Sequence, residues 1–154
     1  MIIEVWKLPP DGASFAGEEP PDILDLPGEE EIQADYPVTY DFTAQTVSGE
    51  LIVHGQVATR IGFLCSRCGE SFALEIRDPE FRCVREYADK YASVDLTQDI
   101  REAIILRFPP YPVCSATCRG LCARCGTNLN KDACHCARPA TDQRWGALDG
   151  LEIK

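Results

Sequence analysis

Apolar and polar residues alternate along the middle of the chain, between residues 34 and 88. The alternation is clear over 38–42 and returns over 72–76. A period of two places the apolar side chains on one face of a β-strand. Ser48 and Gly49 separate two such runs and are suited to a hairpin turn. The pattern predicts an antiparallel meander of about four strands with one buried face.

The period lengthens after this region. Apolar residues recur at intervals of three or four from Leu96 to Ile104, which is typical of an amphipathic helix. Asp95 or Thr97 is suited to its N-cap, and a proline pair at 109–110 ends it, because proline cannot donate a backbone hydrogen bond. We expect the helix to cover the sheet. The fold class is therefore α+β, with an antiparallel β-sheet or partial barrel and one covering helix.

The N-terminal part of the chain is acidic and rich in turn-forming residues. Residues 7–31 predict turns around one short strand at 23–26. Residues 1–50 contain twelve acidic residues and one lysine, whereas residues 51–154 contain thirteen acidic and fourteen basic residues. This acidic part is either a solvated surface or a contact for a basic partner such as a ribosomal protein. Because the whole chain is acidic it repels phosphate backbones, and we expect no DNA partner.

The last part of the chain is rich in cysteine and poor in large apolar residues. Residues 113–140 hold six of the nine cysteines, and their only large apolar side chains are Val113, Leu121 and Leu129. So little apolar surface cannot offset the entropy of ordering the segment. The odd cysteine count and the lack of a signal-peptide pattern argue against disulfides. We therefore expect a cytoplasmic protein whose end is held together by metal.

These observations predict three parts. An acidic, loop-rich N-terminal segment with short strands occupies 1–33, the body of sheet and helix occupies 34–112, and a cysteine-rich zinc-binding segment occupies 113–154. The strongest apolar cluster, residues 103–106, is far too short to span a membrane, so no membrane partner is expected.

Two segments share one local design. They are Cys65-Ser66-Arg67-Cys68-Gly69 and Cys122-Ala123-Arg124-Cys125-Gly126. Two cysteines at this spacing can converge on one ion, and the glycine that follows lets the backbone turn so that its amides point at the thiolates. Each pair supplies two ligands, whereas tetrahedral zinc takes four.

Several ligand sets are open. Cys134 and Cys136 are close enough in sequence to complete the second pair, which gives Cys122, Cys125, Cys134 and Cys136. By elimination, Cys114 and Cys118 would complete the first pair with Cys65 and Cys68. The alternatives are a single site of Cys114, Cys118, Cys122 and Cys125, or a site in which His135 replaces Cys134 or Cys136. Cys83 and His54 are interpreted as ordinary strand residues.

Clustered thiolates favour zinc or an iron–sulfur cluster over magnesium or calcium. The cysteine spacings typical of iron–sulfur clusters are absent, so we expect Zn²⁺, as one or two structural ions. Catalytic zinc keeps a position open for water and usually has histidine or carboxylate ligands, which are scarce here. No phosphate-binding glycine loop or nucleophile motif is present, and the chain is predicted not to be an enzyme.

At this point the chain resembles the YceD family, bacterial proteins also found in plastids and named for accumulation of large-subunit ribosomal RNA. The resemblance covers roughly residues 35–150. It rests on Cys65-Ser66-Arg67-Cys68, on Val94-Asp95-Leu96 before the helix 99–106, on Pro109, Pro112, Val113 and Cys114, on the run 118–130, and on Cys134, Cys136, Asp142 and Arg144.

The resemblance implies a part in the synthesis, processing or accumulation of large-subunit ribosomal RNA. The expected partner is a ribosomal or RNA-processing protein, and precursor ribosomal RNA is a further candidate. One alternative is a direct RNA-binding zinc module, in which one face carries Arg60, Arg67, Arg77, Arg82, Arg85, Arg119 and Arg124. Another is a thiol-redox or zinc-responsive regulator that uses Cys65 and Cys68.

Overall fold

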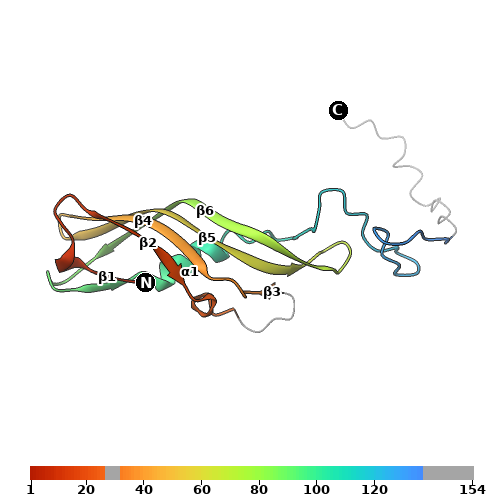
Figure 1. Cartoon of the computed structure of the whole chain (residues 1–154), viewed down its shortest axis with the longest axis horizontal. Helices are drawn as coiled ribbons and strands as arrows, with labels where there is room; N and C mark the ends of the chain where they lie inside the picture. The colour runs from red at the N-terminus through yellow and green to blue at the C-terminus, as the bar shows by residue number, and fades with distance from the viewer. Residues whose placement is uncertain (27–31, 137–154) are drawn as a thin grey trace, which may run out of the picture.

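Two antiparallel sheets and one α-helix make up the part of the chain that the computed structural model describes, residues 1–26 and 32–136 (Figure 1). The strands are β1 (Ile2–Glu4), β2 (Ala13–Glu19), β3 (Ile32–Gln33), β4 (Val38–Val47), β5 (Glu50–Leu64), β6 (Ser71–Glu86) and β7 (Ser93–Asp95). The helix α1 spans Thr97–Ile105, and two 3₁₀ turns, η1 (Val5–Lys7) and η2 (Pro21–Leu24), follow β1 and β2.

Strand β5 is the centre of the larger sheet. Its whole length pairs with β6, and its other edge pairs with β4 and then with the short β3. Strand β2 pairs with the outer edge of β4 over seven residues. The smaller sheet joins β1 to β7, so the first strand of the chain lies beside the segment that leads into α1.

The turn between β4 and β5 confirms the predicted hairpin. Ser48 and Gly49 both have positive φ, 53° and 88°. A two-residue turn with positive φ at both positions matches the right-handed twist of the strands it joins, and glycine reaches that region without a steric penalty.

The hydrophobic core lies between the larger sheet and α1. Alternate side chains of β4 and β5 point into it, and Phe42 stacks on Phe81 of β6 at 4.5 Å between ring centroids. From the helix, Ile100 and Ile104 are fully buried. Arg85 on β6 forms an ion pair with Asp99 of α1, which fixes the helix against the strand.

The α+β class with an antiparallel sheet and one covering helix is confirmed, whereas the partial barrel is not, because the two sheets are open. The body has three long strands where about four were predicted. The expected strand at 23–26 is wrong: Pro21–Leu24 forms η2, since Pro20 and Pro21 hold the backbone in a turn. The predicted N-cap at Asp95 or Thr97 is wrong, because the N-cap is Leu96, although Asp95 Oδ1 accepts a hydrogen bond from Thr97 N at 2.9 Å.

The three-part division stays a prediction, and its last part extends beyond the described residues. Of the N-terminal part, β2 is a full member of the larger sheet. No helix in the described ranges is long and apolar enough to cross a membrane.

Removing the buried end of α1 should destabilise the body. Ile104→Ala leaves a cavity in a fully buried site and is expected to lower the free energy of unfolding by about 2–5 kcal/mol. Leu106→Ala, two residues further on, is the matched control, because Leu106 is 82% exposed and its truncation should change little. Urea denaturation measures both variants, and equal effects would contradict the placement of α1.

Candidate metal centres

Four cysteines converge at the far end of the β5–β6 hairpin. The sulfur atoms of Cys65, Cys68, Cys114 and Cys118 all lie within 4.8 Å of one another, and we call this set the first centre. The Sγ atoms of Cys65 and Cys118 are 3.8 Å apart, as are those of Cys68 and Cys114. The first two cysteines come from the hairpin, whereas the other two come from the chain after α1 (Figure 1).

The hairpin positions its two cysteines through a tight turn. Gly69, at φ 70°, donates its N–H to the carbonyl of Cys65, and Cys65 N donates to the carbonyl of Glu70. Ser66 N donates to the Pro112 carbonyl at 2.8 Å, which brings the later segment alongside. Three of the four cysteines are buried, with exposed fractions of 3% for Cys65, 5% for Cys68 and 6% for Cys118. The fourth, Cys114, is exposed.

A second centre repeats this design further along the chain. The sulfur atoms of Cys122, Cys125, Cys134 and Cys136 also lie within 4.8 Å of one another. The Sγ of Cys134 is 3.2 Å from that of Cys122 and 3.6 Å from that of Cys125.

The turn of the second centre has the backbone hydrogen bonds of the first. Gly126, at φ 72°, donates to the carbonyl of Cys122, and Cys122 N donates to the carbonyl of Thr127. Leu121 and Asn128 form a single β-bridge across its base. The two five-residue motifs of the sequence therefore adopt the same local structure.

Several N–H groups point at the sulfur atoms. Cys114 N donates to Cys65 Sγ at 3.4 Å, and this bond is the largest cause that lowers the pKa of Cys65 to about 6. Cys125 also has its pKa lowered to about 6, chiefly by the hydroxyl of Thr127. Conversely, hydrogen bonding to Cys118 is the largest cause that raises the pKa of Cys114 to about 12. Each centre thus stabilises some thiolates, but the neighbouring sulfurs hinder full ionisation without a cation.

The two centres are joined by a group of polar side chains. Asn130 donates to Cys118 Sγ at 3.3 Å and accepts from Arg119 N at 2.8 Å. Lys131 Nζ forms an ion pair with Glu70 of the hairpin at 2.7 Å. Sequence reasoning assigned no role to these residues. The signal available was the polar run directly after the second motif, where a turn needs side chains that satisfy backbone groups.

The eight predicted ligands form the two sets expected from the sequence. The alternative set of Cys114, Cys118, Cys122 and Cys125 does not converge, and His135 belongs to neither centre within the described residues. Cys83 lies in the main core, and His54 is exposed on the sheet. That these eight residues bind metal stays a prediction.

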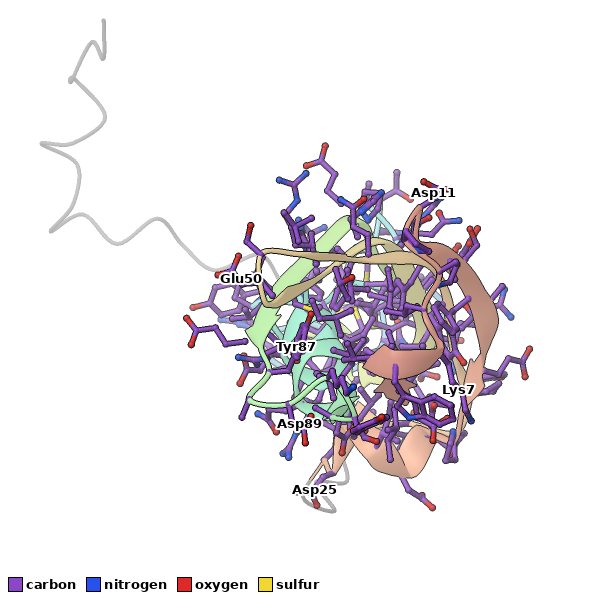
Figure 2. All side chains as sticks on the ribbon, turned by 90° about the vertical axis from the view of Figure 1, so that its left-hand side faces the viewer. Lys7, Asp11, Asp25, Glu50, Tyr87 and Asp89 are labelled. Carbon is purple, nitrogen blue, oxygen red and sulfur yellow. The ribbon has the colours of Figure 1, made fainter. Side chains whose placement is uncertain are left out.

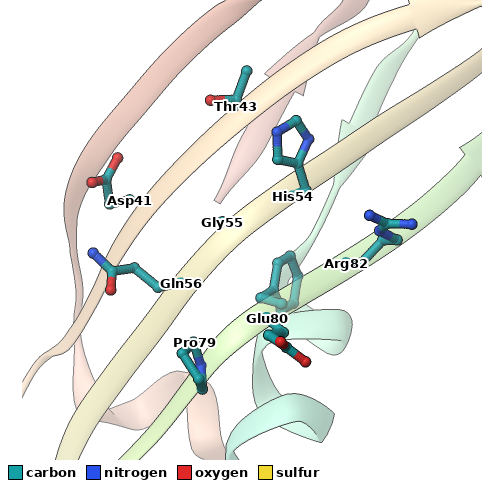
Figure 3. Close-up of a pocket in the computed structure, with 9 residues that line it drawn as sticks. Asp41, Thr43, His54, Gly55, Gln56, Pro79, Glu80 and Arg82 are labelled. Carbon is teal, nitrogen blue, oxygen red and sulfur yellow. The ribbon is translucent and has the colours of Figure 1, made fainter.

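A separate hollow lies on the face of the sheet turned away from α1 (Figure 3). A β-bulge between β5 and β6 opens it where Pro79 interrupts the ladder. Gly55 lies at the bulge, where a Cβ would come within 2.0 Å of the Asp41 carbonyl. His54 and Arg82 line the rim, and none of the eight predicted metal ligands is part of this hollow.

The donor chemistry of both centres fits a tetrahedral metal ion. Four sulfur ligands at about 2.3 Å from zinc would be about 3.8 Å apart, close to the separations in the first centre. No described cysteine is in a disulfide. Both centres could therefore hold a metal ion.

Comparison with known proteins places the C-terminal part of the chain. Residues 84–152 match the family of the large ribosomal RNA subunit accumulation protein YceD. A chloroplastic YCED homolog of that name from Arabidopsis thaliana is 36% identical over 58 residues, which are 38% of this chain and 18% of that protein. The C-terminal part of the chain is thus similar to the YceD family. The matched range contains α1 and six of the eight clustered cysteines.

Other relatives match different lengths of the chain. A Zea mays homolog with the same description is 36% identical over 64 residues, 42% of this chain and 21% of that protein. An uncharacterized protein of Mycobacterium leprae is 26% identical over 129 residues, 75% of this chain and 59% of that protein. The chain thus spans less than two thirds of the length of these relatives. No solved structure is significantly similar to it.

Thiol labelling should separate Cys83 from the eight clustered cysteines. Cys83 lies in the core of the body, where burial is the largest cause that raises its pKa to about 11. The pKa of Cys114 is raised chiefly by hydrogen bonding to Cys118, a contact that is lost when chelation opens the centre. With metal bound, we expect all nine cysteines to resist alkylation. After chelation, mass spectrometry should find label on the eight clustered cysteines while Cys83 stays unlabelled. Early labelling of Cys83 would show that the body had unfolded or that its burial is wrong.

Proposed function

We propose that the chain is a non-enzymatic cytoplasmic factor in the accumulation of large-subunit ribosomal RNA, with its cysteine-rich part folded around two structural zinc ions. The supporting observation is the YceD match over 84–152, together with the plant homologs named as large ribosomal RNA subunit accumulation proteins. In this proposal, the chain supports the synthesis or the processing of the RNA precursor.

Zinc is favoured by the ligands themselves. Thiolates select soft or borderline metals, and four sulfurs arranged around one point suit tetrahedral zinc. Four sulfur ligands complete the coordination of zinc and leave no position for a reactive water. Both ions are therefore structural in this proposal, which is why it assigns the chain no enzymatic activity.

The distribution of charge supports a basic protein as the partner. The turns at the end of the body remote from the cysteines carry Asp11, Glu50 and Asp89 (Figures 1 and 2). With four thiolates each, both zinc centres would carry a net charge of −2, which makes the chain still more acidic. A basic ribosomal or RNA-processing protein would be attracted to such a surface, and the attraction would weaken with salt.

The arginines give less support to direct RNA binding. Arg85 turns toward α1 and pairs with Asp99, and Arg67 donates to the backbone carbonyl of Cys118. Arg60, Arg77 and Arg82 lie on exposed positions of β5 and β6. The seven arginines considered from the sequence therefore do not share one surface. Binding of precursor RNA by the purified chain alone would favour the RNA-binding alternative over the adaptor.

Metal content tests the zinc part of the proposal. Native mass spectrometry of protein purified under reducing conditions should find two zinc ions per chain. Cys68→Ser should remove one ion, because it deletes a ligand of the first centre. Cys83→Ser is the matched control and should keep both. Metal-free protein with an ordered cysteine-rich segment would contradict the assignment.

Deletion of the gene tests the role in ribosomal RNA. Mature large-subunit RNA should fall or its precursor should accumulate, while small-subunit RNA in the same cells serves as the internal reference. The wild-type gene and Cys83→Ser should restore the normal ratio, as measured by quantitative RNA blots and sucrose-gradient profiles. An unchanged ratio and normal subunit profiles in the deletion strain would refute the proposal.

A further inference from the structure

The two centres differ in how much of the molecule holds their ligands in place. Both use the same turn, but the turn of the first centre ends a hairpin of two strands with 15 and 16 residues. The turn of the second centre is closed by one bridge, between Leu121 and Asn128. The ligand geometry of the first centre is therefore preorganised by the sheet, whereas that of the second centre is not.

Burial differs in the same direction. Three sulfur ligands of the first centre are buried, and they pack with Phe72 and Val113. In the second centre, Cys125 and Cys136 are exposed and the other two cysteines are half-buried. A competing ligand can reach an exposed sulfur–metal bond directly, while the first centre presents mainly Cys114 to solvent.

Chain connectivity adds a third difference. In the first centre, Cys68 and Cys114 are 46 residues apart in the sequence. Cys65 and Cys118 are 53 residues apart. Opening of the first centre would detach the segment after Pro112 from the hairpin. The ligands of the second centre all lie between Cys122 and Cys136, so its opening would free only a short local stretch.

We propose that the second centre is an exchangeable zinc site, which releases and rebinds its ion while the first centre keeps its own. This inference rests on the two zinc ions of the proposed function. The stretch from Leu121 to Cys136 would then fold or open with the supply of zinc. The zinc-responsive role considered for Cys65 and Cys68 is thereby assigned to Cys122, Cys125, Cys134 and Cys136.

The contacts between the centres connect release of the second ion to changes in the rest of the protein. When the second stretch opens, Cys118 loses the hydrogen bond from Asn130, and Glu70 loses Lys131. The first centre keeps the bond from Cys114 N to Cys65 Sγ and that from Ser66 N to the Pro112 carbonyl. Release of the second ion therefore changes the surface beside the hairpin without separating the segment from the body.

The test is a chelator titration of the zinc-loaded full chain, followed by native mass spectrometry and alkylation mapping. The chelator 4-(2-pyridylazo)resorcinol serves as the probe for released zinc. We expect a one-zinc species to accumulate, labelled at Cys122, Cys125, Cys134 and Cys136 and protected at Cys65 and Cys68. Release from the second centre should be about tenfold or more faster, the scale on which surroundings alter metal affinity. Simultaneous loss of both ions, or early labelling of Cys65 and Cys68, would overturn the inference.

A pair of variants separates this inference from the proposed function. Cys125→Ser should retain one zinc ion and an unchanged urea midpoint of the body, whereas Cys68→Ser should lose the slow-releasing ion. If Cys68→Ser does not fold, the titration of the wild-type chain still decides. If the protein purified under reducing conditions contained no zinc, this result would contradict the zinc ions of the proposed function. Two ions that leave at the same rate would contradict the exchangeable site alone.

Discussion

Repulsion between clustered thiolates governs the C-terminal part of this chain. Two unit charges about 4 Å apart repel by about 1 kcal/mol in water and about 4 kcal/mol at the effective dielectric of a protein surface. Four sulfurs held within 4.8 Å therefore cannot all ionise unless a cation lies among them. A segment with few apolar side chains has little else to order it, so a cation bound there and the fold of this segment would depend on each other.

The body is stabilised in a different way. Its stability comes from apolar side chains between the sheet and α1, and Phe42, Ile100 and Ile104 need no ligand to remain buried. The β5–β6 hairpin connects the apolar body with the cysteine-rich segment, because its strands belong to the core and its tip carries Cys65 and Cys68. The sheet thus determines where the first centre lies. Contacts with the first centre then determine where the second centre lies.

Much of this arrangement could be predicted from residue patterns. The alternation over 38–42, the turn at Ser48 and Gly49 and the apolar spacing from Leu96 to Ile104 are local signals, and the structure has the corresponding elements. The spacing of Cys134 and Cys136 indicated the second set of four cysteines, whereas the first set was reached by elimination; the structure brings both sets together.

The rest depended on contacts between distant residues. The turn η2 is an exception, because Pro20 and Pro21 at its start are a local signal against a strand, and the short apolar run at 23–26 was given more weight. The pairing of β1 with β7 joins residues that sequence patterns cannot relate. Asn130 was missed for the same reason, since its role becomes visible only once Cys118 lies beside it.

The partnership of β1 with β7 has a consequence for how the protein is made. Ile3 pairs with Val94, so β1 leaves the ribosome well before β7 and must remain without its partner until most of the body has been translated. At about 5–20 residues per second this delay lasts several seconds. During that interval the apolar side chains of Ile3 and Val5 stay accessible to chaperones. Closure of the smaller sheet therefore belongs among the later steps of biosynthesis.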